Sequence, residues 1–178
     1  MKSIKSFLFI ILFFTLCFVI FFKALKVDST CIPEVSTNKS LVNVEFRDFN
    51  TNEITKLNKI LNNEKFYLIN IWSSWCIPCV EENSKLLELS KLPSLKLVGL
   101  NYKDKKNNAE YFLREFGNPY DKLYVDLDGT TSIELGAYGV PETMLLDNKS
   151  KKIIKKYIGP LDDARFQEIT EILKNEKI

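Results

Sequence analysis

The chain has 178 residues, of which 46% are hydrophobic and 27% charged, a mixture typical of a folded protein rather than a disordered one. Its net charge of +2 leaves no basic excess beyond Lys2 and Lys5, so a nucleic-acid-binding protein is not expected. The chain contains no histidine, which excludes a Ser-His or Cys-His nucleophile pair and any histidine-ligated metal or haem site built from this chain.

The N-terminus is basic and then strongly apolar. Lys2 and Lys5 lie in residues 1–6, and residues 7–22 carry no charge. A cleaved secretory signal is one interpretation, but no small-residue cleavage site follows the apolar run. We therefore expect a retained transmembrane anchor over 7–25, which makes the lipid bilayer a partner of the chain. The two lysines favour a cytoplasmic tail at 1–6 and export of the remainder.

A polar segment without periodicity, residues 26–43, is expected to be a linker. It contains Cys31, which we interpret as an incidental exposed thiol, with pairing between two chains as the alternative. The folded domain is expected to cover residues 44–178.

Apolar patterning predicts the elements of this domain. Strands are predicted over 44–49, 66–72, 95–102, 122–126, 143–146 and 152–158, and helices over 54–61, 80–89, 108–116 and from Asp162 or Asp163 onward. Strands alternating with helices, followed by a hairpin and a last helix, predict an α/β domain with a mixed sheet and helices on both faces.

Three of these elements carry more specific expectations. The nearly continuous apolar run 66–72 is typical of a central strand covered on both faces. The alternation of Ile and Lys in 152–158 suits an edge strand that is exposed on one side. In the helix 108–116, we expect the aromatic residues Tyr111, Phe112 and Phe116 to be buried.

Cys76 and Cys79 stand two residues apart at the predicted junction between the strand 66–72 and the helix 80–89. At a helix N-terminus, unpaired backbone N–H groups and the helix dipole favour a thiolate over a thiol. This context predicts a redox-active pair in which Cys76 is exposed and attacks, and Cys79 resolves.

Two other interpretations of the pair are weaker. A zinc site would need a second pair of ligands, but the chain contains neither another CxxC nor a histidine. A purely structural disulfide with this short spacing would constrain little of the unfolded chain. Neither a metal nor a cofactor is therefore expected.

Several stretches also carry a resemblance to known proteins. Trp72-Ser73-Ser74-Trp75-Cys76-Ile77-Pro78-Cys79 resembles the active-site stretch of the thioredoxin superfamily, and Val140-Pro141-Glu142-Thr143 resembles its cis-proline loop. Residues 98–104, 116–120 and 135–143 are similar to the periplasmic thiol:disulfide interchange proteins of cytochrome c maturation, the CcmG/DsbE family. Together with the expected anchor, the resemblance covers essentially the whole chain and implies a thioredoxin-like fold.

The resemblance implies an enzyme, a thiol-disulfide oxidoreductase anchored in the bacterial inner membrane with its domain on the periplasmic side. It would receive electrons from a membrane thiol-disulfide donor. It would then reduce apocytochrome c, or the thiol-carrying maturation partner that holds it. Two alternatives stay open, namely a general periplasmic disulfide oxidoreductase and a non-catalytic scaffold for cytochrome assembly.

The resemblance also assigns residues to substrate binding. Pro141 would be cis and packed against the cysteine pair, so that Val140 and the neighbouring backbone can pair with an extended substrate. An ordinary turn proline is the alternative. Trp72 and Trp75 are expected to serve packing and a substrate platform rather than the chemistry itself.

Two acidic residues match positions near the active site of this family, Glu82 and Glu142. A carboxylate there would raise the pKa of a thiol or accept the proton of Cys79. The alternatives are a solvated helix face for Glu82 and a simple loop charge for Glu142. Asn70 stands where thioredoxins carry a buried acid, which makes Glu82 a candidate substitute for it.

Overall fold

The computed structural model describes residues 2–25, 41–62 and 64–175. The chain divides into two compact units, Met1–Asn38 and Lys39–Ile178.

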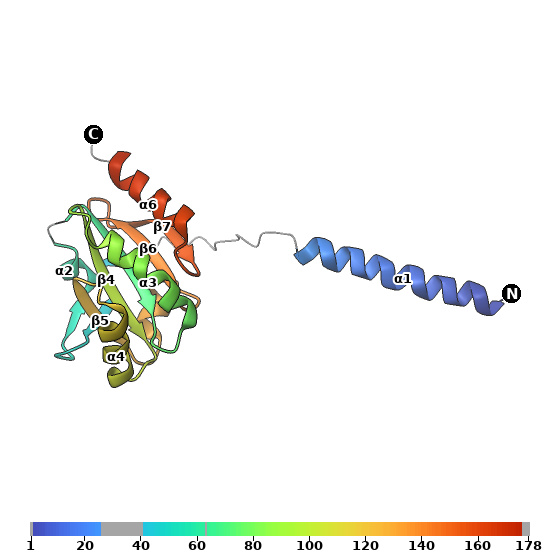
Figure 1. The fold of residues 1–178 in the computed structure, drawn as a ribbon, viewed down its shortest axis with the longest axis horizontal. Coiled ribbons are helices and arrows are strands. Elements are labelled where there is room, and N and C mark those ends of the chain that lie inside the picture. The colour runs from blue at the N-terminus through green and yellow to red at the C-terminus, as the bar shows by residue number, and fades with distance from the viewer. Residues whose placement is uncertain (1, 26–40, 63, 176–178) are drawn as a thin grey trace. The chain divides into compact units, whose positions relative to one another are not determined.

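In the first unit, the helix α1 runs from Lys2 to Leu25 (Figure 1). Within the described part of the chain, no helix combines the length and the apolar character needed to cross a membrane. The anchor expected over 7–25 stays a prediction. The expected linker, apart from residues 41–43, and Cys31 within it lie outside the described residues.

The described strands of the second unit form one mixed sheet. They are β1 (Glu45–Asp48), β2 (Ile54–Lys56), β3 (Phe66–Trp72), β4 (Leu95–Tyr102), β5 (Lys122–Asp126), β6 (Glu142–Asp147) and β7 (Lys152–Ile158). Their order across the sheet is β2-β1-β5-β4-β3-β6-β7. β3, β4 and β5 run parallel to one another, and the other neighbouring pairs are antiparallel.

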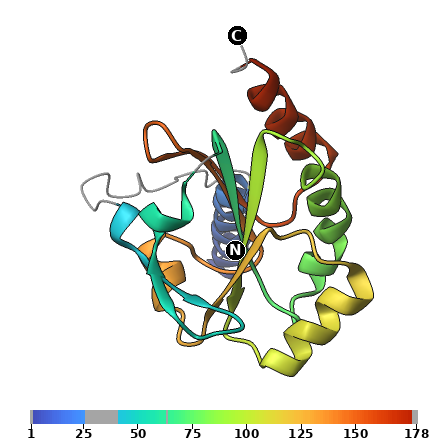
Figure 2. The ribbon, with the colours of Figure 1, turned by 90° about the vertical axis from the view of Figure 1, so that its left-hand side faces the viewer.

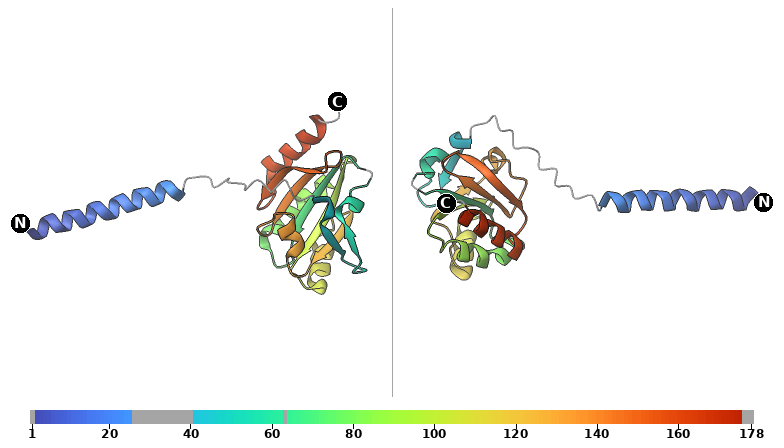
Figure 3. Two further views of the ribbon diagram at one scale, coloured as in Figure 1. Left: turned by 180° about the vertical axis from the view of Figure 1, so that it is seen from behind. Right: turned by 90° about the horizontal axis from the view of Figure 1, so that it is seen from above.

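Helices cover both faces of this sheet. They are the 3-10 helix η1 (Leu41–Asn43) and the α-helices α2 (Leu57–Ile60), α3 (Ile77–Leu89), α4 (Lys106–Phe116), α5 (Thr130–Glu134) and α6 (Asp163–Asn175). Figure 2 shows α3, α4 and α6 on one side of the sheet and α2 and α5 on the other, and the views in Figure 3 agree. The predicted mixed sheet with helices on both faces is confirmed.

β3 is buried along its whole length, as expected for a central strand. Because successive side chains of a strand point to opposite faces, β3 contributes to both hydrophobic cores. The core beneath α3, α4 and α6 receives Phe66, Leu68 and Trp72, and the opposite core receives Tyr67, Ile69 and Ile71. The carboxyl end of β3 then leads directly to the start of α3.

The predicted helix over 54–61 is wrong in its first half. Ile54–Lys56 forms β2, which pairs with β1, and only Leu57–Ile60 is helical. The turn of this hairpin is closed by the Asp48 carboxylate, which accepts hydrogen bonds from the backbone N–H groups of Asn50 and Thr51. Pairing with β1 supplies backbone hydrogen bonds that the local apolar spacing does not reveal.

The predicted burial of the aromatic residues in α4 is only partly right. Phe112 is 3% exposed, whereas Tyr111 is 55% and Phe116 45% exposed. Neighbouring residues on a helix point about 100° apart, so a helix that packs by one face cannot bury both Tyr111 and Phe112. Phe116 ends the helix, where its ring contacts that of Phe112 at 5.0 Å between centroids.

Replacing Leu68 with alanine should remove a large side chain from the fully buried centre of β3. We expect the free energy of unfolding to fall by about 2–5 kcal/mol, because a cavity remains where the side chain was. Urea unfolding followed by tryptophan fluorescence measures this change. Ile154→Ala, at a position 42% exposed on the edge strand β7, should cost far less. Equal losses for the two variants would contradict this account of the core.

Candidate active site

The two cysteines lie where β3 gives way to α3, and they form a disulfide in the structure. Cys76 is the N-cap residue of α3, and Pro78 occupies its first turn, where no N–H group is needed. The backbone N–H of Cys79 donates a hydrogen bond to Cys76 Sγ at 3.2 Å. Once the disulfide opens, this N–H group and the start of the helix favour a thiolate on Cys76.

The expectation that Cys76 is exposed is wrong for the disulfide form. Cys76 is 4% and Cys79 2% exposed, because both belong to the apolar cluster beneath α3. Val140 packs against the same cluster. The neighbours of Cys76 in sequence are the exposed ones, with Trp75 at 57% and Ile77 at 74%.

The cis-proline loop lies beside the cysteine pair because β6 pairs with β3. In this pairing Glu142 lies opposite Ile71, close to the end of β3 that leads to Cys76. The Val140–Pro141 peptide bond directly before Glu142 is cis, as the resemblance implies. The carbonyl of Pro141 accepts a hydrogen bond of 2.9 Å from the N–H of Gly159, which holds the loop to the chain after β7.

Glu82 is 1% exposed and belongs to a buried hydrogen-bond network, so the solvated-face alternative is wrong. Its Oε1 accepts a bond of 2.8 Å from the Asn70 side-chain amide, and its Oε2 accepts one of 2.9 Å from the N–H of Leu161. The same Asn70 amide donates to the hydroxyl of Thr143, and its oxygen accepts from the hydroxyl of Tyr120 at 2.7 Å. The network joins β3, α3 and β6.

Burial raises the pKa of Glu82 to about 7, although the hydrogen bonds from Asn70 and Leu161 act in the opposite direction. Burial also raises the pKa of Tyr120 well above its usual value, and the charge of Glu82 adds to this effect. Tyr120 therefore stays a protonated donor. Glu82 stands one helical turn after Cys79, on the same side of α3.

The segment before Cys76 is held by Asp104, which follows β4. Its carboxylate accepts hydrogen bonds from both the N–H and the hydroxyl of Ser74, at 2.6 and 2.8 Å. Burial raises the pKa of Asp104, but bonds from Asn101, Ser74 and Lys105 outweigh burial and hold the pKa below its ordinary value. Asp104 therefore stays ionised and fixes the approach to the cysteine pair.

Glu142 is also buried, at 1% exposure, so it is more than the simple loop charge considered as the alternative. Its Oε1 accepts hydrogen bonds from the N–H groups of Tyr138 and Gly139, and its Oε2 lies 2.9 Å from Lys156 Nζ. These contacts tie Glu142 to the loop that precedes Pro141.

Three residues of this site were not assigned a role from the sequence, namely Asp104, Tyr120 and Lys156. Asp104 and Tyr120 lie in stretches that carry the family resemblance, which is the signal that could have drawn attention to them. Lys156 has no such signal, because an alternating Ile/Lys edge strand ordinarily exposes its lysines.

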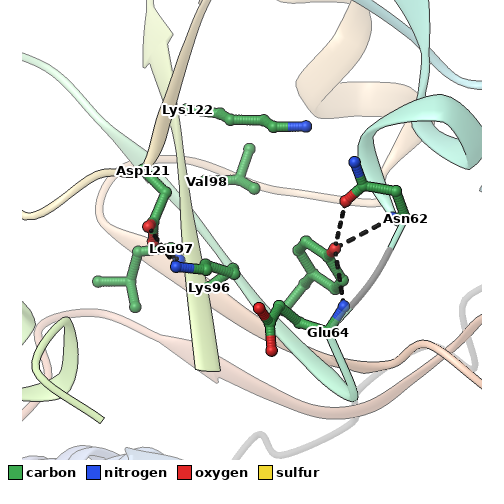
Figure 4. A pocket seen from close by; sticks show the side chains of 8 residues that line it. Asn62, Glu64, Lys96, Leu97, Val98, Asp121 and Lys122 are labelled. Atoms are coloured by element: carbon green, nitrogen blue, oxygen red, sulfur yellow. Dashed lines mark hydrogen bonds and ion pairs between the residues drawn. The ribbon is translucent and has the colours of Figure 1, made fainter. Parts of the chain in front are cut away.

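The structure also contains a pocket of about 270 Å³ away from this site (Figure 4). Its lining comprises Asn62, Glu64, Tyr67, Lys96, Leu97, Val98, Asp121 and Lys122. It lies at the amino ends of β3, β4 and β5, whereas Cys76 follows the carboxyl end of β3. Lys96 is paired with Asp121 at 2.9 Å, and the Tyr67 hydroxyl binds Asn62. The pocket therefore contributes nothing to the cysteine chemistry.

No family model matches the chain. Comparison with curated proteins finds relatives that are thiol:disulfide interchange proteins. The thiol:disulfide interchange protein CycY of Rhizobium leguminosarum bv. viciae is 40% identical over 104 residues, which are 58% of this chain and 55% of that protein. The thiol:disulfide interchange protein DsbE of Allochromatium vinosum is 30% identical over 148 residues, 83% of this chain and 80% of that protein.

Among solved structures, a thioredoxin-like protein from Aeropyrum pernix matches with a TM-score of 0.62 at 15% identity, covering 75% of this chain and 89% of the other. At this identity the match shows the fold, which is thioredoxin-like. The chain spans little more than half the length of CycY, whereas it spans most of the DsbE relative.

Because the pKa of Glu82 is raised in the folded protein, the stability of the fold should decrease as pH rises. Between its ordinary value of 4.5 and about 7, the folded protein retains a proton that the unfolded chain has already lost. The free energy of unfolding should therefore fall as pH rises through this window, by about 3 kcal/mol in all, and level off above it. Glu82→Gln, which cannot titrate, should lack this contribution.

The measurement is urea unfolding of the oxidised protein at about pH 4.5 and about pH 8. At each pH, the free energy of unfolding of Glu82→Gln is subtracted from that of the wild type, and this difference cancels the contributions of the other titrating groups. Glu81→Gln, a change at the exposed neighbouring position, is the matched control and should keep the wild-type pH dependence. If Glu82→Gln also kept it, Glu82 would not hold a proton in the folded state.

Proposed function

The chain belongs to the DsbE family of thiol:disulfide interchange proteins, and we propose that it is a thiol-disulfide oxidoreductase that reduces the disulfides of partner proteins. The observation that carries this proposal is the Cys76–Cys79 disulfide at the first turn of α3, with a backbone N–H of Cys79 directed at the sulfur of Cys76. The cis bond before Pro141 supports it, because the loop that contains this bond lies beside the pair.

The proposed reaction starts from the reduced pair. The Cys76 thiolate attacks one sulfur of the partner disulfide, the partner's S–S bond breaks, and the departing sulfur takes up a proton. The thiol of Cys79 then loses its proton and attacks the sulfur of Cys76. This step breaks the mixed disulfide and releases the second thiol of the partner. The partner gains two electrons and two protons, and the cysteine pair ends as the disulfide seen here.

Glu82 is proposed as the acceptor of the Cys79 proton. A carboxyl whose pKa is about 7 can gain or lose a proton near neutral pH, which suits a general base. Its place one turn after Cys79, inside the same buried region, supports this role. Asn70 holds the carboxyl in position through a bond of 2.8 Å.

For substrate binding, we propose that Trp75, Val140 and Pro141 receive an extended segment of the partner. Trp75 offers an exposed aromatic ring directly before Cys76, and its indole N–H is bonded to the Lys103 carbonyl at 3.2 Å. The Val140–Pro141 stretch offers backbone beside the pair. An extended segment can pair with such backbone as an added strand does.

The partner we propose is apocytochrome c, or the thiol-carrying protein that holds it during cytochrome c maturation. A membrane thiol-disulfide transporter would supply the electrons. The support for both is the family to which the chain belongs together with the family-like stretches at 98–104, 116–120 and 135–143.

A Cys79→Ser variant should trap the partner. Without Cys79 the mixed disulfide on Cys76 cannot be resolved, so it should accumulate, and mass spectrometry identifies the protein attached. The matched control, Cys76→Ser, should trap nothing, because it lacks the attacking sulfur. Recovery of many unrelated proteins would favour a general oxidoreductase.

Two further outcomes would overturn the proposal. A strongly oxidising potential, measured by equilibration with glutathione, would contradict the role of reductant. Normal cytochrome c assembly in a deletion strain that carries the double variant Cys76→Ser, Cys79→Ser would favour a scaffold.

The location we propose is the periplasmic side of the bacterial inner membrane. The large apolar side chains of α1 are 45–75% exposed, from Phe9 to Phe22, and such a surface suits contact with lipid. Alkaline phosphatase fused after Ile178 should be active, and the protein should resist alkaline carbonate extraction. Replacing residues 1–25 by a cleavable export signal should release the protein into the soluble periplasm. An inactive fusion or an extractable full-length chain would contradict this location.

A further inference from the structure

The loop between α5 and the cis peptide bond is attached at both of its ends. At its start, the N–H of Ala137 donates to the carbonyl of Ser132 in α5 at 2.8 Å. At its end, the N–H groups of Tyr138 and Gly139 both donate to Oε1 of the buried Glu142. A carboxylate inside the sheet thus sets the path of the backbone just before Val140.

Lys156 on β7 completes this arrangement. Its side chain is 5% exposed, and its ammonium group donates to the carbonyl of Gly136 and lies 2.9 Å from Glu142 Oε2. The same ammonium lies 4.2 Å from the centre of the Tyr138 ring, within the range of a cation–π contact. The loop is therefore held through two backbone N–H groups, one carbonyl and one aromatic ring.

An ion pair buried to this degree adds little net stability to a fold, because of the free energy of desolvation. Removing two charges from water costs several kcal/mol for each, and apolar replacements of such pairs are often neutral or stabilising. The contacts of Glu142 and Lys156 converge on the loop, so their shared effect is on its conformation. Tyr138, held at its N–H and its ring, is still 61% exposed.

We propose that Glu142 and Lys156 form a clamp that positions the loop 136–141, so that the backbone at Val140 and the ring of Tyr138 receive an extended segment of the partner protein beside its disulfide. The inference rests on the proposed function and deepens it. Glu142 and Lys156 act as positioning residues, and Tyr138 makes the contact that distinguishes a polypeptide from a small disulfide.

The physical reason is the cost of ordering a loop on binding. A loop already held in its bound conformation adds no such cost, whereas a released loop must be ordered again for each partner. A small disulfide that reaches only the sulfur of Cys76 does not need the loop. Loss of the clamp should therefore slow thiol-disulfide exchange with a peptide disulfide and leave thiol-disulfide exchange with a small disulfide almost unchanged.

The test compares two disulfides on the reduced full-length protein in stopped flow, with tryptophan fluorescence as the signal. The probes are oxidised glutathione and a synthetic peptide with one internal disulfide. Three variants are compared with the wild type. The first is Glu142→Gln, and the second combines Glu142→Gln with Lys156→Met, so that no buried charge is left unpaired. The third is Tyr138→Ala. The control is Lys155→Met, on the same strand as Lys156, which breaks the exposed ion pair between Lys155 and Glu168 of α6.

We expect the rate constant with the peptide to fall about tenfold in the three clamp and loop variants, the size of losing one or two ordered contacts. The rate constant with glutathione should change by less than about twofold. Lys155→Met should match the wild type with both probes. Equal losses with both probes, or no loss with the peptide, would overturn the proposal.

Amide hydrogen exchange gives a second measurement that does not depend on activity. The N–H groups of Tyr138 and Gly139 should be protected in the wild type and should exchange faster in Glu142→Gln. Unchanged protection would show that there is no clamp. If the wild type failed to react with the peptide at all, the proposed function would fail, while hydrogen exchange would still decide whether the clamp exists.

Discussion

The hydrogen bond between Asn70 and Glu82 joins the middle of the sheet to the helix that carries both cysteines. A carboxyl group can be buried here only because each of its oxygens accepts a hydrogen bond, from Asn70 and from the N–H of Leu161. The same asparagine also binds Thr143 and Tyr120. A single buried amide on β3 is therefore bonded to β6, to the segment before β5 and to α3. Burial then raises the pKa of Glu82 to about 7, so the packing that joins α3 to the sheet also sets the acidity of this carboxyl.

Around this network, the site is built from three connections that meet at the end of β3. The helix start presents the cysteines and their N–H donor. Asp104 binds Ser74 and so fixes the segment that leads to Cys76. Glu142 and Lys156 hold the loop on the opposite side, before the cis bond. Asp104 and Glu142 both accept hydrogen bonds from backbone N–H groups, and these bonds rigidify the backbone on both sides of the sulfurs.

The predictions that succeeded depend on local pattern. The continuous apolar run of β3 predicted a central strand, and the alternation in β7 predicted an edge, because strand periodicity reports directly which faces are covered. The predictions that failed depend on which strand or which packing face an element meets, and the apolar spacing of the element itself does not show this. Ile54–Lys56 became a strand because β1 lies beside it, and Tyr111 stayed exposed because α4 packs by one face only. Lys156 was not singled out within the edge strand 152–158, because the partners of its ammonium group, Glu142 and the carbonyl of Gly136, lie on other segments.

The sequence by itself determined the cysteine pair and the strand and helix that flank it, because short local patterns encode them. Through a resemblance carried by short stretches, the sequence also indicated the family and the place of Pro141. Only the tertiary structure decided what surrounds the pair. It placed Cys76 among apolar side chains in the disulfide form. It buried Glu82, which raises the pKa of that carboxyl, and it brought Glu142 of β6 close to Lys156 of β7. Burial and the pairing of charges depend on which distant segments meet, and no local pattern in one strand or helix carries that information.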